Sequence, residues 1–412
     1  MKRAVSAAAG AVAWLASWAL TLALWPAASQ AELWTAENRI ESRLETNDNY
    51  LLAPKSNGTV NTLSLSDTLK ASRQTEASAT RVDAFVAALG ARGVGGESRV
   101  DGRLAVAQTL TAPRDEFSLA ALYAQDFNDS VQTADVTVGR GRRRTATLNG
   151  AWSHSLSERL STSLQGAYDH TSYAQSGASS YGDASLGGSL SYRLSDTDSV
   201  NLQVNRSDYR SGMGNIRSTT DSVSVGAART LSELSSASVS IGTYRTRSAV
   251  DGFGVACPIS AIFCESGLVS LVTFHVRRES TTQGVQYSAS YRYQLDERTG
   301  LSFAAARQQS PSGAGSVVRN DTINASATRT FSETLNGSIS YAQSRSTQQV
   351  LGGGQIGQRQ LSLVVAHQLS SDVNVGAAYQ RTESNPVGGR AHSNSLAISI
   401  SIDWPRRLEA SH

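Results

Sequence analysis

The segment from residue 146 to residue 168 alternates apolar and small polar side chains with a period of two. Leu148 and Trp152 fall on one face of an extended chain, and Ser153 falls on the other. A tight polar turn follows at residues 157–159, and the alternation then resumes. This pattern is typical of a β-hairpin with one apolar and one polar face. The same unit recurs down the chain, so the fold is expected to consist of repeated antiparallel hairpins.

Short polar turns alternate along the chain with longer segments rich in Gly, Ser, Asn and Pro. The short turns place an apolar residue before two polar residues, as in Leu156-Ser157-Glu158 and Leu231-Ser232-Glu233. The longer segments include residues 171–182, 310–320 and 381–392. Short turns on one side and long loops on the other are typical of a bacterial outer-membrane barrel, with the turns in the periplasm and the loops outside the cell.

Counting the alternating segments predicts eighteen strands, with sixteen as the alternative. The predicted strands are 39–51, 59–73, 76–90, 98–110, 116–127, 143–156, 159–173, 182–194, 199–210, 219–231, 235–248, 279–295, 300–309, 320–331, 335–346, 358–369, 373–382 and 393–404. An even count leaves both chain ends in the periplasm, as single-chain bacterial barrels require. The sequence therefore predicts an all-β, antiparallel, up-and-down transmembrane β-barrel over residues 32–404, with a short periplasmic tail at residues 405–412.

The composition fits a barrel with a wet interior. Ser, Thr, Asn, Gln and Gly are abundant, and hydrophobic residues make up 40% of the chain, whereas a soluble β-sandwich of this size would need a drier core. A barrel with a polar lumen needs apolar residues only on its outer face. After the N-terminal segment no window approaches ~18 consecutive apolar residues, so no transmembrane helix is expected.

The N-terminal 31 residues have the pattern of a secretory signal peptide. A positive start at Lys2 and Arg3 precedes an uncharged apolar run from Ala7 to Leu24, and Ser29 and Ala31 supply small residues for cleavage after Ala31. The alternative is an uncleaved N-terminal anchor. We expect export and a location in the bacterial outer membrane. Removing the two basic residues leaves 37 − 2 = 35 basic against 34 acidic residues, a net charge of +1.

Aromatic side chains mark the two ends of the predicted outer face. A tyrosine lies near the outer end of several ascending strands, and Trp404 closes the apolar alternation of the last strand. Amphipathic aromatic residues favour the headgroup level of a membrane. The predicted interface girdle consists of Tyr123, Tyr168, Tyr341, Tyr379 and Trp404. An aromatic end to the final strand is also what the outer-membrane assembly machinery is expected to recognise.

Two segments give the chain a resemblance to a known family. The run Arg43-Leu44-Glu45-Thr46-Asn47-Asp48-Asn49-Tyr50-Leu51-Leu52 and the segment Ser310-Pro311-Ser312-Gly313-Ala314-Gly315-Ser316 are similar to a family of outer-membrane β-barrel porins, as are the repeated hairpins. The resemblance covers about residues 35–404. Members of this family are often associated with exopolysaccharide or exosortase gene neighbourhoods. The resemblance thus implies a porin-like barrel, and it supplies no catalytic residues.

The longest predicted loop, residues 249–278, contains both cysteines of the chain. Cys257 and Cys264 are separated by six residues, and a local disulfide is expected in an oxidising periplasmic or extracellular compartment. Metal ligation and two free thiols are the weaker alternatives. The loop also carries an apolar run from Leu268 to Val276, which needs cover. It could fold into the mouth of the pore, stand above the membrane as a strand ribbon, or pack on its neighbours as a stapled loop.

The densest charge cluster lies in or beside another external loop and consists of Arg140, Arg142, Arg143 and Arg144. Arginine is suited to paired contacts with phosphate or carboxylate groups. We therefore treat the cluster as a candidate anion-binding loop for lipopolysaccharide phosphates or an acidic polysaccharide. A solvated loop end is the alternative reading.

Catalysis and nucleic-acid binding are not expected. The six histidines are scattered, serine is too common to be informative, and no hydrolase motif occurs. The glycines at 352–354 lack a following Lys, so no phosphate-binding glycine loop is predicted. No cofactor and no metal site is expected. Nucleic-acid binding would need interleaved aromatic and basic residues, which are absent.

Two functions stay open from the sequence. The first is a porin-like channel for passive passage of hydrophilic solutes, with polysaccharide export as a specialised form, because barrels of this strand number enclose an aqueous channel. Small inward residues such as Ser189 and Ser338 favour it. The second is a non-conducting surface protein that presents its loops. The expected partners are outer-membrane lipids and lipopolysaccharide, the assembly machinery, and solutes or polysaccharide.

Overall fold

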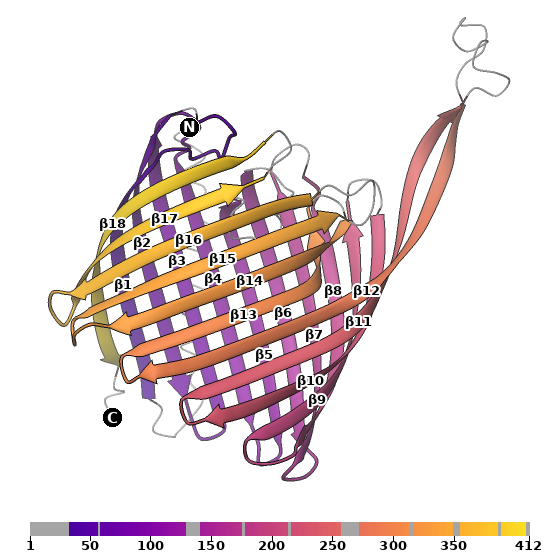
Figure 1. The fold of residues 1–412 in the computed structure, drawn as a ribbon, viewed down its shortest axis with the longest axis horizontal. Coiled ribbons are helices and arrows are strands. Elements are labelled where there is room, and N and C mark those ends of the chain that lie inside the picture. The colour runs from indigo at the N-terminus through magenta and orange to yellow at the C-terminus, as the bar shows by residue number, and fades with distance from the viewer. Residues whose placement is uncertain are drawn as a thin grey trace, which may run out of the picture.

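The computed structural model describes residues 33–56, 58–128, 141–174, 178–212, 216–256, 272–313, 316–348, 355–385 and 389–408. These residues form eighteen strands in one sheet (Figure 1). The strands are β1 (Leu33–Asn47), β2 (Val60–Gln74), β3 (Ser78–Arg92), β4 (Arg99–Thr111), β5 (Asp115–Asn128), β6 (Gly141–Ser155), β7 (Leu160–Tyr173), β8 (Tyr181–Arg193), β9 (Asp198–Ser211), β10 (Ile216–Ser232), β11 (Ser235–Ala256), β12 (Val272–Asp296), β13 (Thr299–Ser312), β14 (Ser316–Thr330), β15 (Leu335–Gln348), β16 (Gln355–Gln368), β17 (Val373–Ser384) and β18 (Ala391–Leu408).

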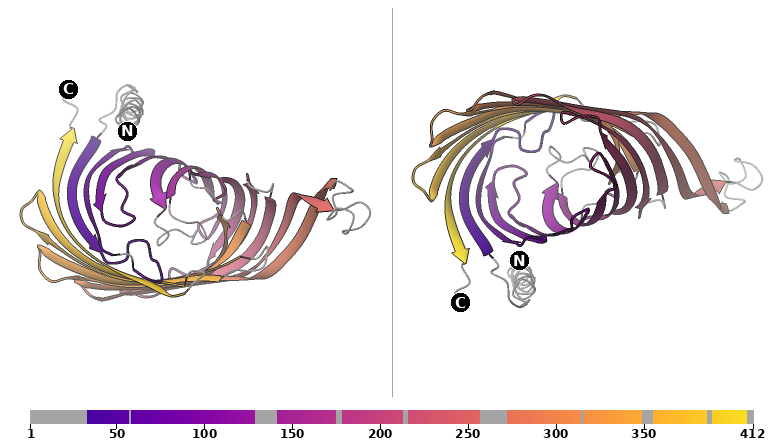
Figure 2. Two further views of the ribbon diagram at one scale, coloured as in Figure 1. Left: turned by 90° about the horizontal axis from the view of Figure 1, so that it is seen from above. Right: turned by 90° about the horizontal axis from the view of Figure 1, so that it is seen from below.

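Each strand pairs antiparallel with the next, and β1 pairs with both β2 and β18, which closes the sheet into a barrel. Seen along its axis, the barrel is a flattened ring (Figure 2). The predicted eighteen-stranded up-and-down barrel is confirmed, and the alternative of sixteen strands is wrong. Within the described ranges, no helix is long and apolar enough to cross a membrane.

The first and last strands differ from their predicted bounds. Strand β1 ends at Asn47 rather than at residue 51, and it begins at Leu33. Strand β18 continues past Trp404 to Leu408, because the early start of β1 gives these residues a partner in register. The predicted periplasmic tail therefore does not begin at residue 405. The predicted signal peptide, residues 1–31, lies outside the described residues.

The two faces of the sheet follow the alternation of the sequence. The outer face carries large apolar side chains that are freely accessible, such as Leu186 at 60% and Ile241 at 62% exposure. A closed barrel satisfies its backbone internally, so an apolar outer band of this kind suits a hydrocarbon environment. The residues of the predicted girdle, Tyr123, Tyr168, Tyr341, Tyr379 and Trp404, all belong to this outer face.

One hairpin is much longer than the rest of the barrel. Strand β11 has 22 residues and β12 has 25, whereas β17 has 12. The β11–β12 ribbon projects beyond the rim (Figure 1). The described parts of predicted loop 249–278, residues 249–256 and 272–278, belong to this ribbon, as in the second of the three expectations for it. The predicted pair Cys257 and Cys264 lies outside the described residues.

The ribbon leaves the barrel wall part-way along β12. The pairing of β12 with β13 ends at Tyr287 and Arg307. From Val272 to Gln286, β12 has β11 as its only strand neighbour within the described part of the chain. Residues 308–312 of β13 likewise pair only with β14 among the described strands. The wall therefore divides here, with the ribbon outside and the tip of the β13–β14 hairpin inside.

Candidate functional site: the lumen wall

The inner face of β1 is a ladder of alternating charges. Its odd-numbered residues lie opposite the exposed, outward Leu44, so they line the lumen. Arg39 lies 3.7 Å from Glu41, and Arg43 lies 3.1 Å from Glu45. Each arginine pairs with the acid two residues further along, because residues two apart share one face of a strand. The first strand thus presents paired rather than free charges to the lumen.

The same Arg-x-acid arrangement recurs on the neighbouring strands. Arg81 contacts Asp83 at 2.8 Å on β3, and Arg99 contacts Asp101 at 3.0 Å on β4. The described ionisable residues on the inner face of β1–β6 are the basic Arg39, Arg43, Lys70, Arg81, Arg99, Arg103 and Arg143, and the acidic Glu37, Glu41, Glu45, Asp83, Asp101, Glu116 and Asp126. The seven basic and seven acidic groups balance. We call this surface the charged wall.

The inner face of β7–β18 is lined mainly by hydroxyl and amide side chains, and we call it the hydroxyl wall. Serines face each other across neighbouring strands and share a hydrogen bond of 2.7 Å at Ser240–Ser288 and at Ser302–Ser326. These rows of small side chains leave room in the lumen and offer both donors and acceptors. Ionisable groups are sparse on this wall, and Asp169 and Asp183, opposite each other on β7 and β8, are two of them.

A narrowing occurs at the outer end of the hydroxyl wall. Val317 packs with the inward-facing Tyr209 and Ile216, and all three are buried. The Tyr209 hydroxyl donates a 2.7 Å hydrogen bond to the Ser312 carbonyl, and the Ser179 amide donates one of 2.7 Å to the Gly313 carbonyl. The tip of the β13–β14 hairpin thus lies on the lumen side of β8–β10. We call these contacts the tip seal.

The tip seal was not predicted. Residues 310–320 were expected to be an external loop, whereas β13 and β14 continue almost to the turn. Within the described residues, the mouth is narrowed by this neighbouring hairpin and not by residues 249–256 or 272–278. Nothing in the alternation pattern links Tyr209 to Val317, because the contact joins strands that are not adjacent in the sheet.

The predicted arginine cluster is divided between two faces. Arg142 and Arg144 point outward near the outer rim, whereas Arg143 points inward and forms a 2.6 Å ion pair with Asp126. Arg140 lies outside the described residues. Consecutive residues of a strand face opposite sides, so the side chains of Arg142, Arg143 and Arg144 do not point toward one site. The Arg-x-acid spacing, which was overlooked, is the sequence signal that would have identified the charged wall.

The described residues contain no group of three His, Cys, Asp or Glu side chains arranged to hold a metal ion. The apolar outer band, the polar lumen, the short turns at one end and the long loops at the other define the class of this protein. It is a transmembrane β-barrel of the bacterial outer-membrane type.

Comparison with known proteins finds no matching family model and no match among curated proteins. Among solved structures, the chain is similar to Acinetobacter baumannii OccAB2, with 12% identity, a TM-score of 0.46, and coverage of 91% of this chain and 98% of that one. It is also similar to Pseudomonas aeruginosa OpdK with vanillate, with 10% identity, a TM-score of 0.48, and coverage of 90% of this chain and 99% of that one. At these TM-scores the similarity bears on neither substrate nor mechanism.

Proposed function

We propose that the protein is a passive outer-membrane channel for small hydrophilic solutes. The observation that supports this most directly is the lumen itself, in which a balanced charged wall faces a hydroxyl wall. Barrels of 16–18 strands enclose an aqueous channel when side chains do not fill them. A hydrophilic solute can exchange its water contacts for hydroxyl and amide groups along the wall without a large desolvation penalty. No enzymatic activity is proposed.

The charged wall would orient solutes rather than exclude one sign of charge. Its seven basic and seven acidic groups cancel, so its field on a monovalent ion is weak at a distance and strong only near a pair. A dipolar or zwitterionic solute gains from such alternating charges. The channel is therefore expected to show weak ion selectivity.

Conductance in a planar bilayer tests the proposal. Refolded protein that lacks residues 312–316 loses the tip seal, so its single-channel conductance should exceed that of the wild type. A matched deletion of residues 257–271, which connect the two strands of the projecting ribbon in the sequence, should leave conductance unchanged. A shift in electrophoretic mobility on heating reports that each barrel has folded. Silence in all three folded proteins would refute the channel.

A second measurement locates the ion path. Neutralising Arg39 and Arg43 with R39Q/R43Q leaves unpaired carboxylates on the charged wall and should move the reversal potential toward cation selectivity. The matched S338A/S340A variant changes the hydroxyl wall without changing charge and should keep the wild-type reversal potential. Equal reversal potentials in all three proteins would show that ions do not pass the charged wall.

Passage of a polysaccharide is the specialised form of the proposal. It is supported by the family resemblance and by the many hydroxyl groups of the lumen, which can bind sugar hydroxyls in place of water. Neutral oligosaccharides added to one side of the bilayer should then cause brief current blockades. The blockades should become less frequent when the oligosaccharide is withdrawn from that side. Unchanged current at saturating oligosaccharide would remove this form and leave the small-solute channel intact.

A non-conducting surface protein is the second candidate. It is supported by the projecting ribbon and by burial at the outer end of the lumen, where Val318 and Ser346 are 0% and 1% exposed. The segment after β1 also curls into the ring (Figure 2), where the Asn49 side chain donates a 2.8 Å hydrogen bond to the His392 carbonyl. If these contacts fill the mouth, the folded wild type will be silent and only the deletion of residues 312–316 will conduct.

A further inference from the structure

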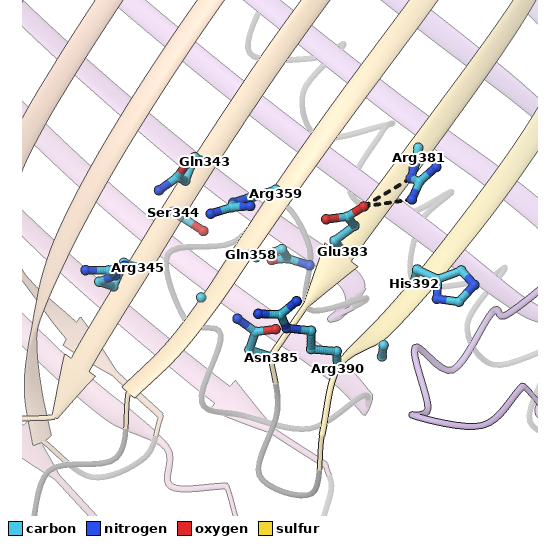
Figure 3. A pocket seen from close by; sticks show the side chains of 12 residues that line it. Gln343, Ser344, Arg345, Gln358, Arg359, Arg381, Glu383, Asn385, Arg390 and His392 are labelled. Atoms are coloured by element: carbon cyan, nitrogen blue, oxygen red, sulfur yellow. Dashed lines mark hydrogen bonds and ion pairs between the residues drawn. The ribbon is translucent and has the colours of Figure 1, made fainter.

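A basic hollow of about 250 Å³ lies on the outer wall across β15–β18, at the end of the barrel with the long loops. Figure 3 shows Arg345, Arg359, Arg381 and Arg390 around it, with Glu383 as the acidic member. The hollow takes no part in the lumen. We propose that it binds the phosphate groups of a phosphorylated glycolipid in the outer leaflet of the membrane.

The strand register places these side chains on the lipid-facing side of the wall. Arg345 is two rows above Tyr341 on β15, and Arg381 follows Tyr379 on β17 by two residues. Residues two apart share a face, and Tyr341 and Tyr379 share theirs with the exposed apolar band. In the register, Arg359 lies opposite Glu383 on the next strand. The hollow is therefore built by regular strands and does not depend on loop conformation.

The hollow has an excess of positive charge. Arg381 forms a 2.9 Å ion pair with Glu383. Across the described residues, no carboxylate lies within ion-pair distance of Arg345, Arg359 or Arg390, and all three side chains are exposed. Counting four arginines against one glutamate gives a net charge of +3 with His392 neutral. By contrast, Arg307 and Arg319 on the two preceding strands both contact Asp321.

The middle of the hollow has space for a ligand. Gly357 lies opposite Arg345 on the adjacent strand, and a Cβ placed on it would meet only the Ser344 carbonyl oxygen, at 3.9 Å. The missing side chain leaves a floor of backbone between arginines on either side. A tetrahedral anion on that floor could accept hydrogen bonds from more than one guanidinium, which is the geometry in which arginine binds phosphate best.

The position of the hollow relative to the membrane indicates which ligand it binds. Immediately toward the membrane lies the row Ile339, Leu363, Tyr379 and Leu396, which is apolar and outward. The arginines thus begin where the hydrocarbon band ends, at the headgroup level of the leaflet beside the long loops. The phosphates available there belong to the phosphorylated glycolipid of the outer leaflet. Long arginine stems suit this boundary because they can lie along apolar surface while the charged end reaches the headgroup.

The first test of the proposal uses the wild-type mature barrel reconstituted in nanodiscs. One preparation contains a phosphorylated glycolipid, a second contains the same glycolipid after enzymatic dephosphorylation, and a third contains the phosphorylated glycolipid together with millimolar inorganic phosphate. Retention of glycolipid by the protein is then measured by native mass spectrometry. Retention of the phosphorylated form only supports the proposal. Equal retention of both forms, or displacement of the glycolipid by millimolar inorganic phosphate, overturns it.

Variants locate the site. R345Q/R359Q removes two unpaired donors and should weaken retention about tenfold, and G357L, which fills the floor without changing charge, should weaken it as well. The control R229Q/R329Q removes two outward arginines at the opposite rim and should retain glycolipid as the wild type does. All are surface changes, and heat-dependent mobility confirms the folded barrel. Equal losses in the control and in R345Q/R359Q would show that only overall charge matters.

Discussion

The charged wall and the hydroxyl wall belong to one closed sheet but are held together in different ways. Across the charged wall, long side chains pair mostly along a strand, as Arg43 does with Glu45 at 3.1 Å, and Arg143 pairs with Asp126 on the neighbouring strand. Across the hydroxyl wall, short side chains pair between strands, as Ser240 does with Ser288 at 2.7 Å. The long side chains of the charged wall therefore fill part of the lumen and set its electrostatic field. The short side chains of the hydroxyl wall leave space in the lumen, and the tip seal packs against this wall. In this barrel, the residues that set the electrostatic field of the lumen are therefore different from the residues that narrow it.

The largest expected effect concerns the tip seal of the hydroxyl wall. Tyr209 is 1% exposed, and Y209A removes a buried ring and its hydrogen bond to Ser312. Loss of a large buried aromatic side chain should lower the free energy of unfolding by about 3–5 kcal/mol, measured by urea unfolding in lipid vesicles. The control Y168A truncates an outward tyrosine that is 52% exposed and should have a much smaller effect. Equal losses would mean that the seal contributes nothing to stability.

The next effect separates the lumen face of the hydroxyl wall from its lipid face. Ile339 points outward with 46% exposure, and its neighbour Ser338 points inward. An arginine in the hydrocarbon band destabilises a barrel by about 2–4 kcal/mol at the midplane, so I339R should unfold at a lower urea concentration. S338R places the same charge in the polar lumen and should stay close to the wild type. A larger loss in S338R would reverse the assigned faces.

A smaller effect is expected at the charged wall. The side chain of Arg143 is 19% exposed and lies 2.6 Å from Asp126. R143Q leaves that carboxylate without its charged partner and should lower the free energy of unfolding by about 1.5–3 kcal/mol. The double variant R143Q/D126N should recover part of this loss, and the coupling follows from the double-mutant cycle. Strictly additive losses would show that the two side chains do not interact.

The smallest effect distinguishes buried from open hydroxyl pairs. Ser218 and Ser248 share a buried hydrogen bond of 2.8 Å beneath the tip seal. S218A leaves the Ser248 hydroxyl without that partner and should lower the free energy of unfolding by about 1 kcal/mol. S240A removes an equivalent hydroxyl from a pair that is exposed in the lumen, where water replaces it, so its effect should fall within about 0.5 kcal/mol. The same urea unfolding assay ranks the two, and an equal loss would contradict the burial of the seal.

The barrel could be predicted in detail because its signal is local. Each strand alternates with a period of two and ends at a polar turn, so the eighteen strands and their faces follow from the sequence. The same rule, applied to the arginines, would have placed Arg142 and Arg144 outside and Arg143 inside. The charged wall could have been found in the same way, from acids two residues after arginines.

The tip seal could not be predicted on the same basis, and the ribbon could be stated only as one of three alternatives. Tyr209 meets Val317 through the interior of the barrel, and no periodicity within either strand reports a partner on a non-adjacent strand. Strands β11 and β12 continue through Gly252 and Gly254, where the side-chain alternation fades. Glycine-rich stretches are ordinarily read as loops, so the alternation pattern alone does not decide among the three alternatives for residues 249–278.

The early separation of β12 from β13 also fixes how deep this protein sits in its membrane. From Asp296 to Tyr287 the two strands stay paired over 296 − 287 = 9 residue steps. With ~3.4 Å per residue and a strand tilt of about 40°, this paired wall is roughly 23 Å tall, close to the apolar band of about 25 Å in such barrels. Beyond Tyr287 the backbone of β12 has one edge without a strand neighbour in the described chain, and lipid cannot solvate its N–H and C=O groups. In a bilayer thicker than this paired wall, lipid would contact the unpaired backbone edge of β12. Membrane thickness, rather than loop contacts, therefore sets the upper limit of insertion on this side.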